Sequence, residues 1–351
     1  MGCSKYETKS MSNEEKIKCL QPLIQLKHNE QKVVNKEKLQ IITKIEEIMQ
    51  SEELNTSYNG GIYSLIETED KRIASGSADG NISISSYNVN EKKWKIDVHK
   101  ENAHNDSVRS LCNLTENRLL SGSNDLSIKV WDLSDTDITL TKEIKEHTHW
   151  VCMVIPLTKE RFASCSCDKT VKIWDHNKTY KCLSTLIYDD EVRSILQLKG
   201  KEVLVSCGWI SSTGLSFWNL NTYTKQHIIK GYDVYLPTHM IELSDGNIAL
   251  SFFDRPFSIV IIDSSSYQIR SDIQLKEYIN WASSLCVLNE HSFIYVCKGA
   301  FLQISSEDYS ILYQSKGQFF NGDYGIISLQ GGKYFAIQND TRISIIKPSY
   351  D

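Results

Sequence analysis

The residues with the best spacing for metal chemistry stand in one stretch of the chain. His147 and His149 come shortly before Cys165 and Cys167. Imidazole and thiolate are ligands that zinc prefers, and a zinc site takes at least three of them from the protein. Alternate residues of a strand share one face, but two thiols alone do not complete such a site. We therefore expect Cys165 and Cys167 to be small core residues, and we expect no metal.

Catalytic motifs are absent from the sequence. It contains no glycine-rich phosphate loop with a following lysine, no Gly-x-Ser-x-Gly elbow and no His-Glu-x-x-His helix. Carboxylates such as Glu191 lack an obvious partner for acid–base work. We therefore expect a protein that is not an enzyme, with no catalytic residues and no cofactor.

The net charge limits the classes of partner that we expect, and the use of cysteine indicates the cellular compartment. The formal net charge is -5, whereas domains that bind nucleic acid are usually strongly basic, so we expect no nucleic-acid partner. The chain has no apolar run long enough for a transmembrane helix or a signal peptide. Its ten cysteines show no regular pairing, which favours reduced thiols in a cytoplasmic protein. Five of them lie in hydrophobic strand patterns: Cys112, Cys152, Cys165, Cys167 and Cys207.

Two segments that lie 43 residues apart repeat one pattern. Arg118–Asp125 is followed by Ile128–Asp132, and Arg161–Asp168 is followed by Val171–Asp175. Each copy reads as a strand, a turn and a second strand that ends in Trp-Asp. A unit of this content that recurs every forty-odd residues predicts a radial array of four-stranded sheets.

The repeats continue from Ile62 to the end of the chain. Residues 62–351 number 290, and division by a forty-odd-residue unit gives about seven units. Landmarks of the first four units are 44, 43 and 44 residues apart: Tyr87, Trp131, Trp174 and Trp218. The last three units are weaker pairs of short strands: Asn247–Ser251 with Ile259–Asp263, Phe293–Cys297 with Phe301–Ile304, and Tyr334–Gln338 with Ile343–Ile346.

These units resemble the WD-repeat β-propellers over roughly residues 57–351. The resemblance implies an all-β propeller in which a tetrad of His, Ser or Thr, Asp and Trp braces each regular blade; the unit count predicts seven blades, with six or eight as the alternatives. A buried aspartate needs donors, a buried indole needs an acceptor, and an imidazole can bridge them. We therefore expect structural histidines, which also removes His147 from any metal site. The two complete tetrads are His104, Ser121, Asp125 and Trp131, and His147, Ser164, Asp168 and Trp174.

Other units depart from the family pattern. The first has Ser85 where the Trp should stand and no matching His, and the fourth has Asp189 in place of the His and extra residues at Trp209–Gly214. The last unit ends without an outer strand. In this family the N-terminal flank commonly supplies that strand and so removes an open sheet edge. Leu54–Tyr58 is the segment that we expect there.

In propellers of this type, residues at the start of each innermost strand line the narrow top face. Trp, Tyr and Arg at such positions are the types that dominate binding hot spots. Transferred to this chain, these positions and those beside the turns give the expected partner-binding residues: Tyr63, Ser107, Arg109, Asn124, Trp150, Cys167, Glu191, Arg193, Trp209, Trp281 and Tyr324.

Some of these residues have a second, structural interpretation. Trp150 and Trp281 also suit a role as wedges between blades. Arg109 and Arg193 also suit a role in neutralising nearby carboxylates such as Glu191. Because the two arginines occupy equivalent places in the second and fourth blades, together they suit an acidic or phosphorylated peptide.

The N-terminal region differs in composition from the rest. Residues 1–11 are polar and resemble the start of dually acylated proteins, with Gly2 for myristate and Cys3 for palmitate, although Tyr6 stands where the usual motif has Ser or Thr. Residues 12–51 predict a helical segment with a broad apolar stripe, interrupted by one proline. The stripe suits either packing on the propeller or a short coiled coil with a partner.

The function that we expect is a non-enzymatic interaction scaffold. Its propeller, residues 54–351, would bind a peptide or loop of a partner protein on the top face, where a rigid ring loses little entropy on binding. One alternative is a membrane-tethered signalling subunit with the layout of heterotrimeric G-protein β subunits. A second alternative is the substrate receptor of a ubiquitin ligase. We expect a cytoplasmic location, with membrane association only if Gly2 or Cys3 is acylated.

Overall fold

The structure is a computed structural model of the 351-residue chain. It describes residues 53–56, 58–91, 93–115, 117–177, 179–208, 214–229, 237–252, 258–275, 284–297, 300–314, 325–329, 334–339 and 342–346. Several predictions fall outside these residues and stay predictions: acylation at Gly2 and Cys3, the helical segment 12–51, and the roles of Trp209, Trp281 and Tyr324. Among the described residues, no helix is long and apolar enough to cross a membrane.

The described strands form seven antiparallel sheets of four strands each. The first sheet contains β2 (Ile62–Glu67), β3 (Ile73–Ser77), β4 (Ile82–Asn88) and β5 (Lys93–Lys100). The second contains β6 (Val108–Leu114), β7 (Arg118–Ser123), β8 (Ile128–Leu133) and β9 (Ile138–Ile144). The third contains β10 (Val151–Leu157), β11 (Arg161–Ser166), β12 (Thr170–Asp175) and β13 (Cys182–Ile187). The fourth contains β14 (Val192–Gln197), β15 (Val203–Gly208), β16 (Leu215–Asn219) and β17 (Thr224–Ile229).

The three C-terminal sheets follow the same order from the innermost strand outward. The fifth contains β18 (Pro237–Glu242), β19 (Ile248–Phe252), β20 (Ser258–Ile262) and β21 (Ile269–Gln274). The sixth contains β22 (Ser284–Asn289), β23 (Ser292–Cys297), β24 (Ala300–Ser305) and β25 (Ile311–Gln314). The seventh contains β26 (Ile326–Leu329), β27 (Tyr334–Asn339), β28 (Arg342–Ile346) and β1 (Glu53–Asn55).

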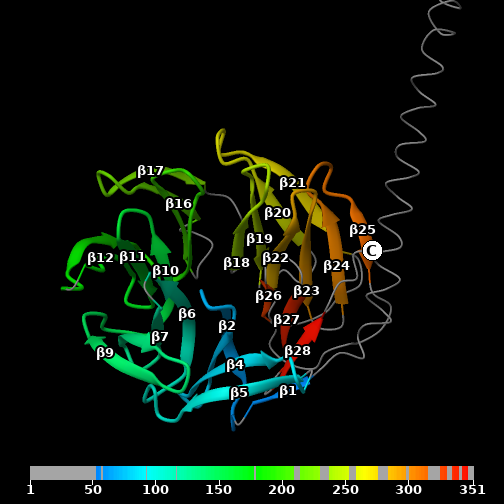
Figure 1. Ribbon diagram of the computed structural model, residues 1–351. Coiled ribbons are helices and arrows are strands. Elements are labelled where there is room, and N and C mark those ends of the chain that lie inside the picture. The colour runs from blue at the N-terminus through cyan, green and yellow to red at the C-terminus, as the bar shows by residue number, and fades with distance from the viewer. Residues whose placement is uncertain are drawn as a thin grey trace, which may run out of the picture. The chain divides into compact units, whose positions relative to one another are not determined.

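The seven sheets are the blades of a closed ring (Figure 1). Each innermost strand contacts the innermost strand of the next blade, and β26 of the seventh blade contacts β2 of the first. The predicted seven-bladed β-propeller is therefore confirmed.

The seventh blade joins the two ends of the described chain. Strand β1 pairs antiparallel with β28, with Leu54 opposite Ile343. The N-terminal flank thus supplies the outer strand, as we expected, but at Glu53–Asn55 rather than at Leu54–Tyr58. Tyr58 is not part of the strand, because its side chain is buried in the first blade, where its hydroxyl binds Ser75.

The hydrophobic core lies between neighbouring blades. Trp131 of the second blade packs in one cluster with Ile82 and Ile84 of the first, and Trp174 of the third packs with Leu120 of the second. The two indoles are among the largest fully buried side chains, and each such burial contributes roughly 1.5–3 kcal/mol. Adjacent blades are therefore held together by the same repeated apolar positions that make up each sheet.

Candidate functional site

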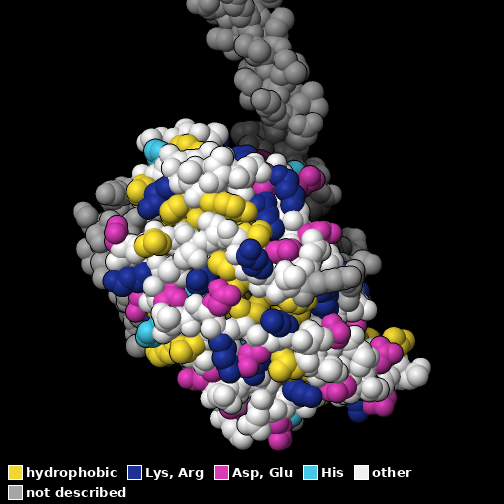
Figure 2. Space-filling view, turned by 90° about the vertical axis from the view of Figure 1, so that its left-hand side faces the viewer, with side chains coloured by type: hydrophobic (Ala, Val, Ile, Leu, Met, Phe, Trp, Pro, Cys, Tyr) yellow, Lys and Arg dark blue, Asp and Glu magenta, His cyan; other side chains and the backbone are white. Residues whose placement is uncertain are grey.

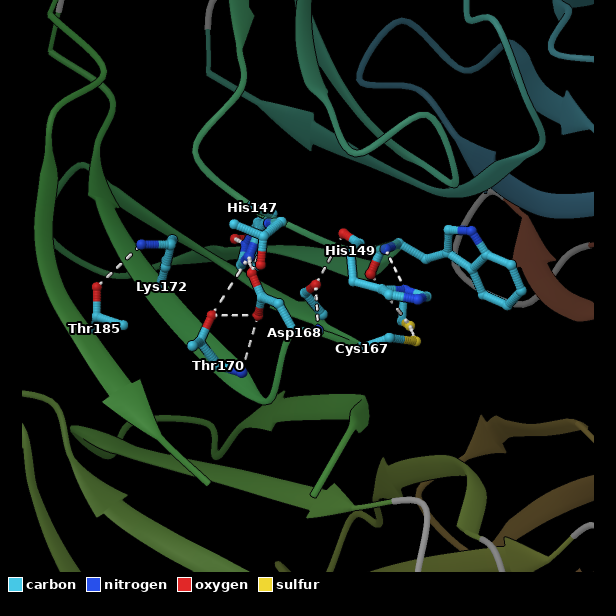
Figure 3. A network of polar contacts seen from close by, with 12 residues as sticks. His147, His149, Cys167, Asp168, Thr170, Lys172 and Thr185 are labelled. Carbon is cyan, nitrogen blue, oxygen red and sulfur yellow. Dashed lines mark hydrogen bonds and ion pairs between the residues drawn. The ribbon is translucent and has the colours of Figure 1, made fainter. Parts of the chain in front are cut away.

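Figure 3 shows the polar network that braces the third blade. The His147 Nδ1–H donates to Asp168 Oδ2 at 2.7 Å, and the Ser164 hydroxyl donates to His147 Nε2 at 2.7 Å. The indole N–H of Trp174 donates to Ser164 Oγ at 2.8 Å, and the Thr170 hydroxyl donates to Asp168 Oδ1 at 2.6 Å. Both ring nitrogens of His147 are therefore occupied inside the protein.

The second blade contains the same network. His104 lies 2.8 Å from Asp125 Oδ2 and 2.6 Å from Ser121 Oγ, which accepts the Trp131 N–H at 2.8 Å. Burial lowers the pKa of His104. Burial also works against the charge of Asp125, but the contacts with His104, Ser127 and the Asn105 N–H together outweigh it and hold the pKa of Asp125 well below its usual range. The histidine is therefore neutral beside an ionised aspartate, which is a structural arrangement.

Tyrosine takes the place of the histidine in the first and fourth blades. The Tyr188 hydroxyl binds Ser206 Oγ, and the Tyr58 hydroxyl lies 2.9 Å from Ser75 Oγ. These serines occupy the ladder positions of Ser164 in the third blade. The prediction that Asp189 replaces the histidine in the fourth blade is therefore wrong, because the neighbouring residue, Tyr188, reaches the serine.

Each tetrad aspartate stands in the turn between the second and third strands of its blade. Backbone hydrogen bonds close these turns, from Leu126 N to Ser123 O in the second blade and from Lys169 N to Ser166 O in the third. Leu126 and Lys169 have φ of 73° and 67°, a region that favours glycine. The first blade has Gly80 there, with φ of 83°. The three turns thus present equivalent positions to the same face.

A β-bulge interrupts the innermost strand of each of the first five blades near its start. Such a bulge leaves one extra residue outside the ladder and re-aims its side chain. In the first four blades the extra residues are Tyr63, Arg109, Cys152 and Arg193, and all four are half-buried. We call the face on which these strands begin the top face.

Two other predicted residues of the top face have structural contacts. Ser107 is buried, and its hydroxyl donates to Ala78 O of the first blade at 3.0 Å, while Asn124 N donates to Ser107 O at 3.0 Å. Ser107 therefore links two blades through its hydroxyl and its carbonyl. Asn124 is half-buried, and among the described residues no donor reaches its Oδ1 atom.

The arginines of the top face stack on aromatic rings of the preceding blade. The guanidinium carbon of Arg109 lies 4.7 Å from the ring centre of Tyr63, and that of Arg193 lies 6.0 Å from the ring centre of Trp150. Arg193 also donates to Glu191 at 2.5 Å. Arg109 has no ion pair within the described part of the chain. Trp150 is 39% exposed, so it is not a wedge buried between blades.

Two cysteines complete this group of side chains. The sulfur atoms of Cys152 and Cys167 are 3.3 Å apart, and Cys167 N donates to Trp150 O at 3.0 Å. Figure 3 shows Cys167 beside His149, on the side away from Thr170 and Lys172. The seven residues form what we call the top-face cluster: Tyr63, Arg109, Trp150, Cys152, Cys167, Glu191 and Arg193.

The cysteines do not create a metal site in the described chain. Cys165 is a core residue between blades, as predicted, whereas Cys167 faces Cys152. Among the described residues, no group of three His, Cys, Asp or Glu side chains could hold a metal ion. The Cys152 thiol is instead more acidic than usual. The hydrogen bond with Cys167 and then the charges of Arg193 and Arg109 hold the pKa of Cys152 below its usual value despite burial.

Sequence reasoning missed Cys152, Tyr58 and Tyr188. Cys152 follows Val151, the first apolar residue of β10, as Arg109 follows Val108, so the rule that selected Arg109 could have selected it. Tyr58 stands 17 residues before its serine, as do the tetrad histidines, whereas Tyr188 stands 18 residues before its serine. Spacing could therefore have found Tyr58, but not Tyr188.

The sides of the propeller carry a different kind of surface. In the side view of Figure 2, Lys and Arg side chains are mixed with Asp and Glu side chains and with hydrophobic groups. Charges of both signs thus lie close together there. The stacked arginines of the top-face cluster are therefore a more specific feature of the surface than the mixed charges on the sides.

Comparison with known proteins agrees with this geometry. Residues 96–132 and 138–175 match the WD40 family, described as "WD domain, G-beta repeat". The structure is similar to that of the WD40 β-propeller domain of Doa1, with a TM-score of 0.67 and 15% sequence identity; the match covers 85% of this chain and 96% of that one. No sequence match was found among curated proteins.

Fold and site together define a seven-bladed β-propeller in which serine-centred networks brace the first four blades. Two units of the chain match the WD repeat in sequence, and the ring as a whole has the fold of a seven-bladed β-propeller. Proteins of this class are typically interaction scaffolds.

Proposed function

We propose that this protein is a non-enzymatic scaffold whose top-face cluster binds an acidic segment of a partner protein. The observation that carries the proposal is the set of β-bulges that bring Tyr63, Arg109 and Arg193 to one face. A bulge residue is not needed for strand pairing, so its side chain is available for contacts outside the sheet.

Arg109 is the residue best suited to bind the partner's anionic group. Its guanidinium carbon lies 4.7 Å from the ring centre of Tyr63, which restricts where the side chain can move, and it has no ion pair among the described residues. A planar, oriented guanidinium binds carboxylates and phosphates through paired N–H donors. Arg193 differs, because Glu191 already accepts its hydrogen bond at 2.5 Å. We therefore assign the first anionic contact to Arg109 alone.

Trp150 adds an apolar contact beside this charge. Its side chain is 39% exposed, although its backbone is fixed by the bond from Cys167. An exposed indole on a rigid backbone loses little entropy when it is covered by a partner. The combination favours a segment that carries an acidic or phosphorylated residue next to an apolar one.

The test is selection from a displayed library of short peptides, followed by fluorescence anisotropy with selected peptides. We expect wild-type protein to enrich acidic or phosphorylated sequences, and Arg109→Ala to weaken their binding by at least about tenfold, the loss of one charge-assisted contact. Affinity should also fall as salt rises.

The matched control is Arg270→Ala. Arg270 also lies over a ring, 5.9 Å from the centre of Tyr309, but on the outer strand β21. Binding should be unchanged in this variant. Enrichment of neutral or basic peptides, or equal binding by the Arg109→Ala protein, would refute an acidic partner at the top face.

A further inference from the structure

Cys152 and Cys167 are placed for reaction with each other. Their sulfur atoms are 3.3 Å apart, whereas a disulfide bond is about 2.05 Å long, so closure needs an approach of roughly 1.3 Å (3.3 minus 2.05), which is within the reach of side-chain rotation. Cys152 lies in the bulge of β10, and Cys167 directly precedes the turn residue Asp168.

The surroundings of the pair favour one reactive thiol. Cys152 is half-buried and so partly accessible to solvent, whereas Cys167 is buried. The Cys167 hydrogen bond, then the positive charges of Arg193 and Arg109, lower the pKa of Cys152. The thiolate is the nucleophilic form of cysteine, and neighbouring cations increase its fraction.

The other described thiols have different surroundings. Burial in apolar core raises the pKa of Cys112, and burial also raises the pKa of Cys207 and Cys286 to about 12. Cys182, on the outer strand β13, is half-buried, and its sulfur contacts Ser184 and Thr185 rather than a second thiol. Cys152 is thus the one cysteine of the described chain that combines access, nearby cations and a thiol partner.

We propose that Cys152 and Cys167 form a peroxide-oxidisable dithiol on the top face, with Cys152 as the attacking thiol and Cys167 as the resolving thiol. The oxidant is hydrogen peroxide or another small hydroperoxide. The modification does not depend on peptide binding by the same face.

The reaction has two balanced steps. The Cys152 thiolate attacks one peroxide oxygen, so that an S–O bond forms, the O–O bond breaks, and the departing hydroxide takes up a proton to become water. The Cys167 sulfur then attacks the resulting Cys152 sulfenic acid, the S–S bond forms, and the S–O bond breaks. The hydroxide that leaves takes the Cys167 proton, so two thiols and one hydrogen peroxide yield one disulfide and two waters.

The test exposes the reduced full-length chain to low concentrations of hydrogen peroxide. Free thiols are blocked at intervals, and each of the ten cysteines is mapped by mass spectrometry. We expect a Cys152–Cys167 disulfide and a faster loss of the Cys152 thiol than of the Cys182 thiol, because the thiolate is the form that attacks peroxide and nearby cations favour it at Cys152. Dithiothreitol should restore both thiols.

Serine variants assign the two roles. In Cys167→Ser, the sulfenic acid at Cys152 has no resolving thiol, so dimedone should trap it there. In Cys152→Ser, the thiol of Cys167 should survive the same exposure. Cys182→Ser is the matched control and should form the disulfide at the wild-type rate.

Three results would overturn the proposal. They are a Cys152 thiol that is lost no faster than that of Cys182, a disulfide from Cys152 to Cys165 in place of Cys167, and oxidation of Cys167 in the Cys152→Ser protein. Circular dichroism of each variant checks that the propeller is folded. A refolded wild-type sample without peroxide fixes the background.

Discussion

At the scale of single residues, a serine hydroxyl is the centre of each brace. It is bound by an imidazole in the second and third blades and by a phenol in the first and fourth. Burial raises the pKa of Tyr58 to about 12 and also raises that of Tyr188, so both phenols remain protonated at neutral pH. The tyrosine therefore binds the serine as a neutral phenol, whereas in the second and third blades an imidazole paired with an aspartate does so.

The serine of the third blade offers the sharpest test of this network. We expect Ser164→Ala to lower the free energy of unfolding by roughly 2–4 kcal/mol, because it leaves the Trp174 N–H without its acceptor and His147 Nε2 without its donor. The measurement is urea unfolding at pH 7, followed by tryptophan fluorescence.

Ser85→Ala is the control, at the position where the first blade lacks the tryptophan. Ser85 is also buried, yet its hydroxyl has no hydrogen-bond partner among the described residues. Its removal should change stability by less than about 0.5 kcal/mol or be slightly stabilising. Equal losses in the two variants would contradict a special role for Ser164.

The sequence predicted part of the site at this scale. Both tetrads could be predicted because the resemblance to WD-repeat blades assigns a place to His, Ser, Asp and Trp, and these residue types need hydrogen-bond partners when they are buried. Arg109 and Arg193 could be predicted as equivalent positions. Their separate roles could not, because the Glu191 contact that occupies Arg193 depends on side-chain geometry. The Cys152–Cys167 pair depends on a bulge, which a simple alternation of residues does not reveal.

At the scale of elements, the short strand β1 does most to close the ring. Leu54, at its centre, is 4% exposed and packs with Ile343 and with Ile62 of the first blade. Without β1, the edge of β28 would be open to pairing with other chains.

Leu54→Ala tests this closure. We expect a loss of roughly 2–4 kcal/mol in stability, because the change removes buried apolar contacts on both sides of the closure. Thermal unfolding, monitored by circular dichroism, gives the size of the effect. Leu183→Ala is the control, since Leu183 is 43% exposed on the outer strand β13; similar melting temperatures for the two variants would argue against β1 as the closing element.

The elements of the weakest units were nevertheless visible in the sequence. Every residue of β19 and β20 is buried, and both strands overlap the predicted pairs Asn247–Ser251 and Ile259–Asp263. Continuous apolar runs between polar turns are enough to indicate buried strands. The N-terminal closing strand was displaced from its predicted bounds because Tyr58 has a different role, which strand propensity does not predict.

At the scale of the whole molecule, neighbouring blades approach closely at one repeated small residue. The equivalent ladder positions are Gly76, Gly122, Cys165 and Cys207 in the first four blades. A Cβ atom on Gly122 would lie 2.8 Å from Val151 Cγ1 of the next blade. Small size at this position therefore sets the spacing of the ring, and it explains two of the core cysteines.

A double-mutant cycle tests that spacing. Gly122→Ala should destabilise the protein by about 1–3 kcal/mol, since overpacking outweighs the smaller gain from a stiffer unfolded chain. Val151→Ala removes the clashing methyl group, so the combined loss should be smaller than the sum of the single losses by at least about 0.5 kcal/mol. Additive losses in urea unfolding would show that the two blades do not press on each other there.

The global architecture was the most predictable level. Seven blades followed from the repeat length, because the blades use the same apolar positions around the ring. The partner did not follow, because it depends on a few side chains that are independent of this repeat.

The bulges have a consequence for how such a protein can change. Tyr63, Arg109, Cys152 and Arg193 sit at corresponding points of four blades, and each is skipped by the ladder of its own sheet. A substitution at one of them leaves every interstrand pair in place. Substitutions at these four residues can therefore change the chemistry of the top face while the strand pairing of the propeller is kept. A designer who seeks a new binding preference would begin with these four positions.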